Sequence, residues 1–207
     1  MREGHTRERL KELQALPPER KIGFTAARII EWHNHFKGKV YVAFSGGKDS
    51  TVLLYIARSL FPDMRAMFVD TGLEYPGIRE FVKRQPDIDI RRPGMNFKQV
   101  IETYGYPVIS KEVAKNIYWA RKCPDGATIK RFDAYSDYCK RYGERFCMAK
   151  YKWLLDSPFK ISDLCCRIMK KAPSKEYEKE TGLHPIVGTM TVESRLRETE
   201  WIRNGCN

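Results

Sequence analysis

The sequence KVYVAFSGGKDSTVLL, residues 39–54, joins a strand pattern, a glycine turn and a helix pattern. Its first six residues form a short apolar run rich in β-forming side chains, which predicts a buried strand over 39–44. The glycine pair within 45–50 predicts a turn, and an apolar helix is expected over 51–60. A strand, a turn and a helix in this order predict the first half of a βαβ unit.

Strand and helix patterns alternate along much of the chain. Further strands are expected at 64–69, 87–91 and 185–189, and further helices at 5–16, 24–37, 76–84, 96–104 and 193–203. This alternation predicts an α/β fold with a doubly wound, mostly parallel sheet that helices cover on both faces. Ligands of such sheets bind beyond the carboxyl ends of the strands, which is where residues 45–50 and 70–72 are expected.

Segment 111–160 interrupts the alternation and predicts a helical basic insertion. It holds 12 of the 38 Lys and Arg residues but 6 of the 26 Asp and Glu residues, so it carries half of the net charge of +12. A basic surface favours anionic partners such as nucleotides or nucleic acid, although a solvated lysine-rich face explains the charge as well. The aromatic residues of the segment either stack on bases or pack in its core; they include Tyr118, Trp119, Tyr135, Tyr138, Tyr151 and Trp153.

Length and composition predict a single folded domain. The chain has 207 residues, of which 42% are hydrophobic and 12% aromatic, which excludes a disordered protein. Its expected parts are N-terminal helices at 1–38, a βαβ core at 39–110, the basic insertion at 111–160 and a C-terminal segment at 161–207. No apolar run approaches the ~20 residues that span a bilayer. The N-terminus lacks the apolar stretch of a secretory signal, so a cytoplasmic protein without a membrane partner is expected.

The turn Ser45–Ser50 has the chemistry of a phosphate-binding loop. It opens a helix, whose first backbone N–H groups and positive dipole end favour an anion. Gly46 and Gly47 allow the backbone to approach an anion closely, and Lys48 adds a mobile positive charge. The spacing matches neither a Walker P-loop nor a dinucleotide-binding glycine motif.

The remaining polar residues of this turn point to a metal-bound phosphate. Ser45, Ser50 and Thr51 supply hydroxyl groups. The carboxylate of Asp49 repels phosphate unless a divalent cation lies between them, so Asp49 predicts Mg²⁺.

The six cysteines favour roles other than disulfides, because no secretory signal is present and the chain is larger than small disulfide-stabilised domains. No C-x-x-C spacing indicates a zinc ribbon. The adjacent Cys165 and Cys166 are unsuited to bridging each other, but two such thiols serve as soft ligands of a metal cluster. The alternative is a pair of small buried apolar side chains.

Ser45–Ser50 resembles the pyrophosphate-binding loop of the N-type ATP pyrophosphatases and of their relatives, the phosphoadenosine phosphosulfate reductases. Both belong to the adenine nucleotide alpha hydrolase superfamily. Three later segments resemble blocks of the reductase-like branch in the same order: FVDTGLEYP at 68–76, CCRIMKK at 165–171 and VGTMTVESRLR at 187–197. The resemblance extends from about Lys39 to Arg203 and implies an adenine nucleotide alpha hydrolase-like sheet.

This resemblance implies a role for each matching residue. Lys48 and the loop amides would hold the pyrophosphate part of ATP, Asp49 would hold Mg²⁺, and Ser50 would donate a hydrogen bond. These three are the catalytic candidates. The full set expected to bind the nucleotide is Ser45, Gly46, Gly47, Lys48, Asp49, Ser50, Thr51, Asp70, Thr71, Gly72, Gly188, Arg195 and Arg197. Residues 70–72 would hold the ribose or adenine end, and the two arginines either clamp phosphate or sulfate or belong to a solvated helix face.

Three functions remain open at this point. The first is cleavage of ATP between its α and β phosphates, which adenylylates a substrate in sulfur transfer. The second is reduction of an adenylylated sulfate to sulfite, and the third is nucleotide binding without catalysis. The complete loop favours ATP cleavage, because sulfonucleotide reductases usually carry a degraded loop. A reductase also needs a Glu-Cys-Gly-Leu-His tail, and here Thr181 stands in place of its cysteine.

The cysteine pair also implies a candidate iron–sulfur site. Relatives that bear a cluster carry a Cys-Cys pair and a later C-x-x-C, whereas here only Cys206 follows the pair. Cys165, Cys166 and Cys206 are therefore three candidate ligands of a 4Fe–4S cluster, and a fourth, such as Cys147, would be needed. We expect an adenine nucleotide as the first partner, a sulfur-donor or redox protein as the second, and nucleic acid at 111–160 as the third.

Overall fold

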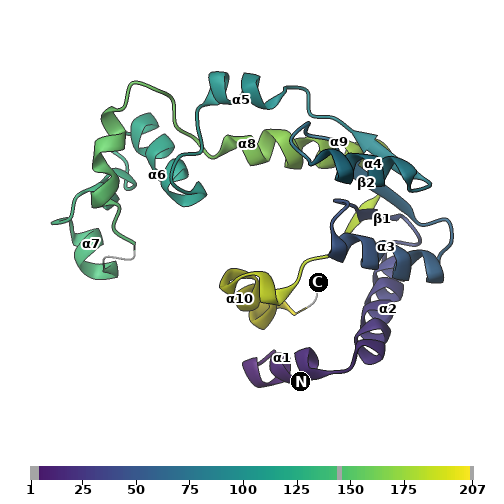
Figure 1. Cartoon of the computed structure of the whole chain (residues 1–207). Helices are drawn as coiled ribbons and strands as arrows, with labels where there is room; N and C mark the ends of the chain where they lie inside the picture. The colour runs from purple at the N-terminus through teal and green to yellow at the C-terminus, as the bar shows by residue number, and fades with distance from the viewer. Residues whose placement is uncertain (1–4, 144–145, 206–207) are drawn as a thin grey trace. The chain divides into compact units, whose positions relative to one another are not determined.

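The computed structural model describes residues 5–143 and 146–205, which form two compact units (Figure 1). The first, called here the sheet unit, comprises residues 5–70, 74–91 and 175–205. The second, called here the helical unit, comprises residues 71–73, 92–143 and 146–174. The helical unit is wider than the insertion predicted at 111–160, and the assignment of one domain to the whole chain stays a prediction.

The sheet unit contains four strands, which are all parallel and lie in the order β3-β2-β1-β4. They are β1 (Val40–Ala43), β2 (Arg65–Val69), β3 (Ile88–Arg91) and β4 (His184–Val187). β1 is central: Tyr41 pairs with Arg65 of β2 on one side and with Pro185 of β4 on the other. The α/β fold with a parallel sheet is therefore confirmed, and each predicted strand lies within two residues of its expected bounds.

The sequence does not predict α9 (Ala172–Thr181), which is shared between the units, or the short η4 (Thr191–Glu193) of the sheet unit. The other helices of the sheet unit lie near their expected positions: α1 (Arg7–Ala15), α2 (Pro18–His35), α3 (Lys48–Leu60), α4 (Pro76–Arg84) and α10 (Arg195–Asn204). Two of them begin earlier than predicted. α2 begins at Pro18, because proline is favoured in the first turn of a helix. α3 begins at Lys48 and not at residue 51, because Gly47 already takes the extended N-cap conformation.

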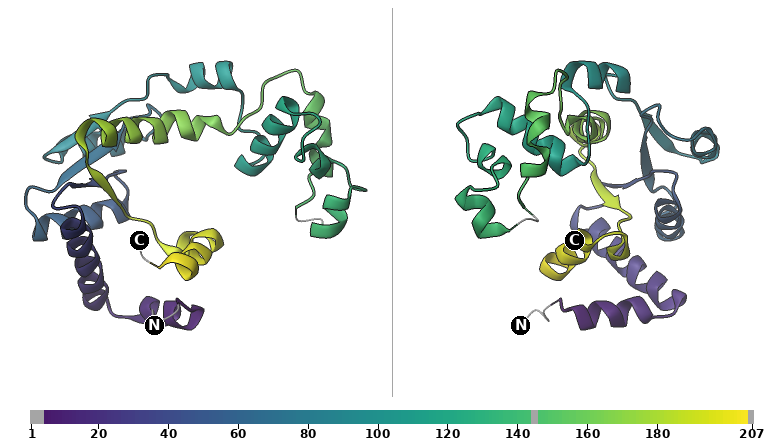
Figure 2. Two further views of the ribbon diagram at one scale, coloured as in Figure 1. Left: turned by 180° about the vertical axis from the view of Figure 1, so that it is seen from behind. Right: turned by 60° about the vertical axis from the view of Figure 1, so that its left-hand side comes forward.

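Helices cover both faces of the sheet, because side chains alternate along each strand (Figures 1 and 2). Val42 and Phe44 pack against α2, α3 and α4 on one face. Tyr41 and Met67 pack against Tyr177 of α9 on the other face. The sheet is thus doubly wound, as the alternation of strands and helices predicts.

Hydrogen bonds of two buried tyrosines connect α9 to the sheet. The Tyr177 hydroxyl donates to Oδ2 of Asp89 at 2.6 Å, and the Tyr41 hydroxyl donates to Oε1 of Glu178 at 3.1 Å. Burial, reinforced by the bond to Asp89, raises the pKa of Tyr177 to about 12. Burial and the neighbouring Glu178 carboxylate raise the pKa of Tyr41 as well. Both hydroxyls therefore stay protonated well above neutral pH.

The helical unit consists of short helices around a separate core. Its elements are α5 (Phe97–Tyr104), α6 (Lys111–Lys122), η1 (Ile129–Phe132), α7 (Asp137–Tyr142), η2 (Ala149–Asp156), α8 (Leu164–Cys166) and the π-helical η3 (Arg167–Lys171). Ile117 of α6, Phe132 of η1 and Leu154 of η2 meet in this core. Tyr151 packs against it, whereas Tyr135 and Trp153 are exposed. Core packing therefore accounts for only some of the aromatic residues of this segment.

Arg121 joins α6 to the end of η2. Its guanidinium donates hydrogen bonds of 2.6–2.9 Å to the carbonyl oxygens of Leu154, Leu155, Ser157 and Phe159. The last carbonyl groups of a helix have no partner within the helix. Arg121 supplies that partner and so fixes η2 against α6.

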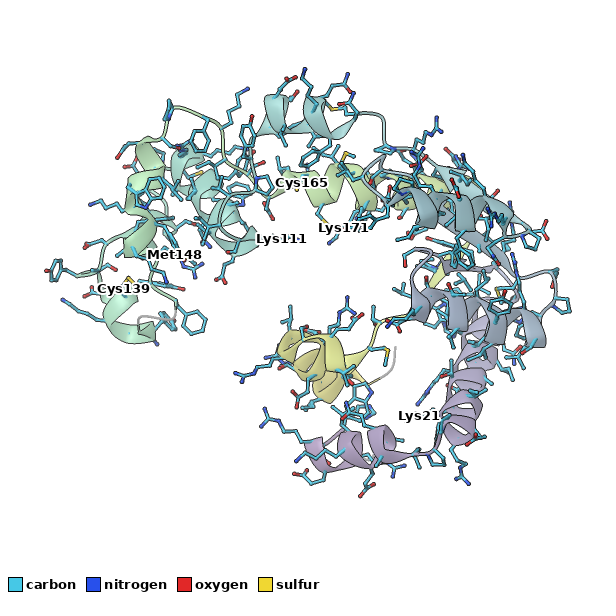
Figure 3. All side chains as sticks on the ribbon, viewed as in Figure 1. Lys21, Lys111, Cys139, Met148, Cys165 and Lys171 are labelled. Atoms are coloured by element: carbon cyan, nitrogen blue, oxygen red, sulfur yellow. A yellow bond between two sulfur atoms is a disulfide. The ribbon has the colours of Figure 1, made fainter. Side chains whose placement is uncertain are left out.

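A disulfide links Cys139 and Cys147 within the helical unit, and Figure 3 labels the first of these. The expectation that the cysteines would not form disulfides is wrong for this pair. Cys139 lies on α7, and its Cα atom is 5.0 Å from that of Cys147, a separation that a disulfide can span. Among the described residues, Cys123, Cys165 and Cys166 are free thiols.

None of the helices in residues 5–143 and 146–205 has the length and apolar character needed to cross a bilayer.

Candidate functional site

The loop 45–50 lies at the point where the sheet changes direction. The chain leaves β1 and passes through α3 to β2 on one side, whereas β4 lies on the other side of β1. The strand order therefore reverses at β1, and the carboxyl ends of the strands at such a reversal are the usual ligand site of an open α/β sheet. The loop that follows β1 is therefore placed where a ligand is expected.

Hydrogen bonds close the loop on itself. Ser50 Oγ accepts from the Ser45 amide at 3.2 Å, lies 3.0 Å from Ser45 Oγ and lies 3.0 Å from the Gly47 carbonyl oxygen. The Thr51 hydroxyl donates to the same Gly47 oxygen at 2.8 Å. Ser50 is buried whereas Ser45 is exposed. Ser50 thus stabilises the conformation of the loop through bonds inside it. The sequence predicts a different role for Ser50, namely a hydrogen bond to the nucleotide.

Gly46 is required by the backbone and by packing. Its φ of +72° lies in the left-handed region, which glycine adopts without strain. A Cβ atom there would lie 2.8 Å from Ile78 Cγ2 and 2.9 Å from Val82 Cγ2, both on α4. The first glycine of the loop therefore allows α4 to pack directly beneath the turn.

The start of α3 combines the first backbone amides of a helix with two exposed charges. The first hydrogen bond of the helix runs from the Thr51 amide to the Gly47 oxygen, so the preceding amides have no acceptor within the helix. Lys48 and Asp49 are exposed in this first turn, and neither forms an ion pair with any residue in the described part of the chain. Amides, a helix dipole and a lysine at one turn make a site for a phosphate group.

Gly188 lies against this turn from the end of β4. A Cβ atom on Gly188 would be 3.4 Å from the Asp49 carbonyl oxygen and 3.3 Å from Leu53 Cδ2. The structure thus brings Gly188 next to the loop residues, as the sequence comparison with the family implies.

Asp70 follows β2 at the same edge of the sheet. Its side chain is 7% exposed, and Oδ2 accepts a hydrogen bond of 3.1 Å from Nη2 of Arg79 on α4. Its amide donates to the Arg91 carbonyl oxygen at 2.8 Å. Arg79 is not among the site residues expected from the sequence, although it lies on the helix that directly follows the Asp70 segment, which was the available signal. Arg79 thus supplies a positive charge and a hydrogen-bond donor to this buried carboxylate.

The remaining residues that the sequence assigns to the nucleotide site are Thr71, Gly72, Arg195 and Arg197. Thr71 and Gly72 belong to the helical unit, where Thr71 Oγ1 accepts from the Leu73 amide at 3.2 Å. Arg197 pairs with Glu193 across the first turn of α10. Among the described residues, no hydrogen bond or ion pair joins Arg195 or Arg197 to the loop. Their role as a phosphate clamp stays a prediction.

The sequence predicts two metal sites, one for Mg²⁺ and one for an iron–sulfur cluster, and the residues present suit the first better than the second. An exposed carboxylate beside a phosphate site suits Mg²⁺, which is commonly held by one or two carboxylates together with substrate phosphates. Asp49 meets that requirement. No cluster of three or more His, Cys, Asp or Glu residues suited to a metal ion occurs in residues 5–143 and 146–205.

Only some of the predicted ligands of an iron–sulfur cluster are available as free thiols among the described residues. Cys165 and Cys166 are half-buried free thiols on α8, and Cys206 lies outside the described residues. Cys147, the suggested fourth ligand, is bonded to Cys139 and so is not a thiolate here. The described donors do not supply the four thiolates of a cluster.

Comparison with known proteins confirms the family of the central segment. Residues 39–122 match the family model of the phosphoadenosine phosphosulfate reductase domain, which belongs to the adenine nucleotide alpha hydrolase-like superfamily. Two similar proteins of Methanocaldococcus jannaschii are the uncharacterized protein MJ0066, 34% identical over 119 residues, and the uncharacterized protein MJ0973, 29% identical over 121 residues. These segments cover 54% and 55% of this chain but 22% and 26% of the relatives, so the match spans about a quarter of their length.

Proposed function

We propose that this chain, whose residues 39–122 match the family model of the phosphoadenosine phosphosulfate reductase domain, binds ATP at the loop 45–50 and cleaves it between the α and β phosphates. The cleavage would adenylylate a substrate in sulfur metabolism. The observation that carries the proposal is the complete loop, closed by its own hydrogen bonds at the switch point of the sheet, with Lys48 exposed in the first turn of α3.

In this reaction a nucleophile attacks the α phosphorus, the bond from that phosphorus to the bridging oxygen breaks, and pyrophosphate leaves with the electron pair. Negative charge accumulates on the leaving pyrophosphate. The α3 amides and Lys48 would stabilise that charge, and donors fixed before the reaction begins are the most effective. The internal bonds of Ser50 and Thr51 keep the donors fixed.

Asp49 would hold Mg²⁺ at the edge of this loop. When bound, Mg²⁺ would screen the phosphate oxygens from the Asp49 carboxylate and from one another. Asp70, held by Arg79 at the neighbouring strand end, offers carboxylate oxygens that accept hydrogen bonds from ribose hydroxyl groups. The loop would thus take the phosphates and Asp70 the nucleoside.

Reduction of an adenylylated sulfate is the second candidate, because the matching family model describes a reductase domain. Reduction releases sulfite and consumes a thiol or another electron donor. It does not require the pyrophosphate loop to be complete, so the intact loop favours ATP cleavage.

Incubation with α-labelled and γ-labelled ATP in the presence of Mg²⁺ separates these functions. Sulfide serves as a simple nucleophile. ATP cleavage predicts labelled pyrophosphate and an adenylyl product, with both lost in Lys48→Ala and retained in the control Lys83→Ala. Release of inorganic phosphate without pyrophosphate would reject α–β cleavage. Sulfite formation from phosphoadenosine phosphosulfate and a thiol would support the reductase instead.

A further inference from the structure

A groove in the helical unit is the strongest remaining feature of the molecule. It has a volume of about 360 Å³ and lies between α6 and the helix formed by α8 and η3. Figure 3 labels Lys111 on one wall and Cys165 and Lys171 on the helix that forms the other. All of its lining residues belong to the helical unit, so it is a site separate from the loop 45–50.

The groove is strongly positive. Five cations line it, against the single carboxylate of Asp163: Lys111, Lys115, Lys122, Arg167 and Lys171. Within the part of the chain that the structure describes, none of these five side chains forms an ion pair. Five cations beside one carboxylate repel one another, and an anionic ligand reduces that repulsion. A groove of this composition is therefore suited to an anion.

The positions of the cations suit an extended anion. Lys111, Lys115 and Lys122 share one face of α6, because residues separated by four and eleven positions lie on the same side of a helix. At a rise of 1.5 Å per residue, this row is about 16 Å long. Arg167 and Lys171, four positions apart, form a second row on the opposite wall. Two rows of this kind match a chain of phosphates better than one isolated phosphate.

Two aromatic rings lie among the cations. Trp119 and Tyr118 line the groove, and the Trp119 ring is 43% exposed. The Lys122 ammonium lies 5.3 Å from the Trp119 ring centroid and 5.9 Å from that of Tyr118. The opposite face of α6, with Val113 and Ile117, fills the core. Trp119 is not among the residues of that core, and an exposed indole beside cations offers a stacking surface for a base.

We propose that this groove binds single-stranded nucleic acid, with its phosphates along the two rows of cations and one base stacked on Trp119. Single strands fit the site better than a duplex, because the bases of a duplex are stacked on each other and are not free to meet an indole. The proposal does not depend on ATP cleavage at the loop.

Fluorescence anisotropy of labelled 15-nucleotide oligo(dT) and oligo(U), measured with the full chain across a salt series, tests the groove directly. Lys115→Ala/Lys122→Ala removes two groove cations. Its matched control, Lys98→Ala/Lys140→Ala, removes two exposed cations of the same unit that do not line the groove. Trp119→Ala removes the stacking surface, and Trp153→Ala removes an exposed tryptophan elsewhere in the unit. Circular dichroism verifies that each variant is folded.

We expect the groove double variant to bind at least tenfold more weakly at 50 mM salt than the wild type. Its log–log salt slope should be smaller in magnitude by about 1.4, since each lost phosphate contact changes the slope by ~0.7 for a single strand. Trp119→Ala should weaken binding by roughly fivefold or more, and both controls should bind like the wild type. A preference for oligo(dT) or oligo(U) would identify the natural strand as DNA or RNA.

Three results would overturn the proposal. Equal binding by the groove variants and their controls would place any oligonucleotide elsewhere on the chain. Displacement of the oligonucleotide by ATP at the same phosphate concentration would make the groove a mononucleotide site. In the third result, inorganic polyphosphate displaces the labelled oligonucleotide as effectively as unlabelled oligonucleotide does, and Trp119→Ala binds the oligonucleotide as tightly as the wild type. The groove would then recognise negative charge alone.

Discussion

The loop 45–50 and the groove beside α6 are both suited to phosphate, but they achieve this with different parts of the chain. The loop relies on backbone amides, two glycines and short hydroxyl side chains that are bonded to one another. The groove relies on long cationic side chains that stand on two helices without ion pairs to the described residues. Fixed amides favour one ligand geometry, whereas mobile cations accept many.

This difference predicts different behaviour in solution. Binding at the loop should depend on the exact nucleotide and on Mg²⁺ and should respond weakly to salt. Binding at the groove should tolerate many sequences and weaken steeply with salt. The variants that follow affect one site at a time and so show whether the two are truly separate.

Lys48→Ala should produce the largest effect, a fall of roughly 100-fold or more in pyrophosphate formation. The ammonium group is the only side-chain cation within the loop sequence 45–51, so no neighbour in the loop can replace it. Oligonucleotide binding measured by anisotropy should not change. A parallel loss of both activities would contradict the separation of the sites.

Arg121→Ala should destabilise the helical unit by about 2 kcal/mol, because carbonyl groups at the end of η2 lose their hydrogen-bond partner. Urea unfolding followed by the fluorescence of the tryptophans measures this loss. Oligonucleotide binding should weaken as α6 loosens, while ATP binding at the loop persists. Arg141→Ala, which changes an exposed arginine on α7, serves as the control.

Gly46→Ala should weaken ATP binding by about tenfold, since a left-handed backbone costs an L-residue roughly 1–2 kcal/mol and the new Cβ would crowd Ile78 and Val82. Gly77→Ala is the matched control, because a Cβ there meets no atom within 4 Å. Calorimetric titration with ATP and Mg²⁺ measures both. Equal affinities for the two variants would show that the loop geometry does not matter for binding.

Much of this arrangement is predictable from the sequence, because the signals are local. The apolar run of β1, the glycine turn and the start of α3 adjoin one another, so their patterns alone predict a phosphate loop. The alternation of strand and helix patterns along the chain likewise predicts a parallel sheet with two covered faces.

Other features depend on residues that meet only in the folded chain. Arg79 of α4 pairs with Asp70 at the end of β2, and Cys139 forms a disulfide with Cys147, eight positions later. The groove requires α6 and the helix of α8 and η3 to lie side by side. The sequence shows which charges lie along one helix, but it does not show which other helix packs beside it.

The smallest expected effect is a change in the free energy of unfolding of the sheet unit at high pH. Tyrosine in an unfolded chain loses its proton near pH 10, whereas folded Tyr177 keeps its proton until about pH 12. The folded state therefore binds the extra proton between these values, and stability falls as the pH rises from about 10 to 12. Below pH 10 the contribution is fully present.

Chemical denaturation at pH 9, 10 and 11 measures this fall. Tyr177→Phe should reduce the pH dependence, although Tyr41 still contributes, and the exposed Tyr75→Phe should leave it unchanged. An identical fall in the wild type and in Tyr177→Phe would contradict the assignment.

The central claim is that the loop 45–50 binds the phosphates of ATP independently of the groove. Calorimetric titration of the wild type and of Lys48→Ala/Asp49→Ala with ATP and Mg²⁺ tests it most directly, with oligonucleotide anisotropy measured on the same samples. We predict that the wild type binds both ligands and that the double variant loses ATP while retaining the oligonucleotide. No ATP binding by the wild type at millimolar concentration, or equal ATP binding by the double variant, would contradict the account.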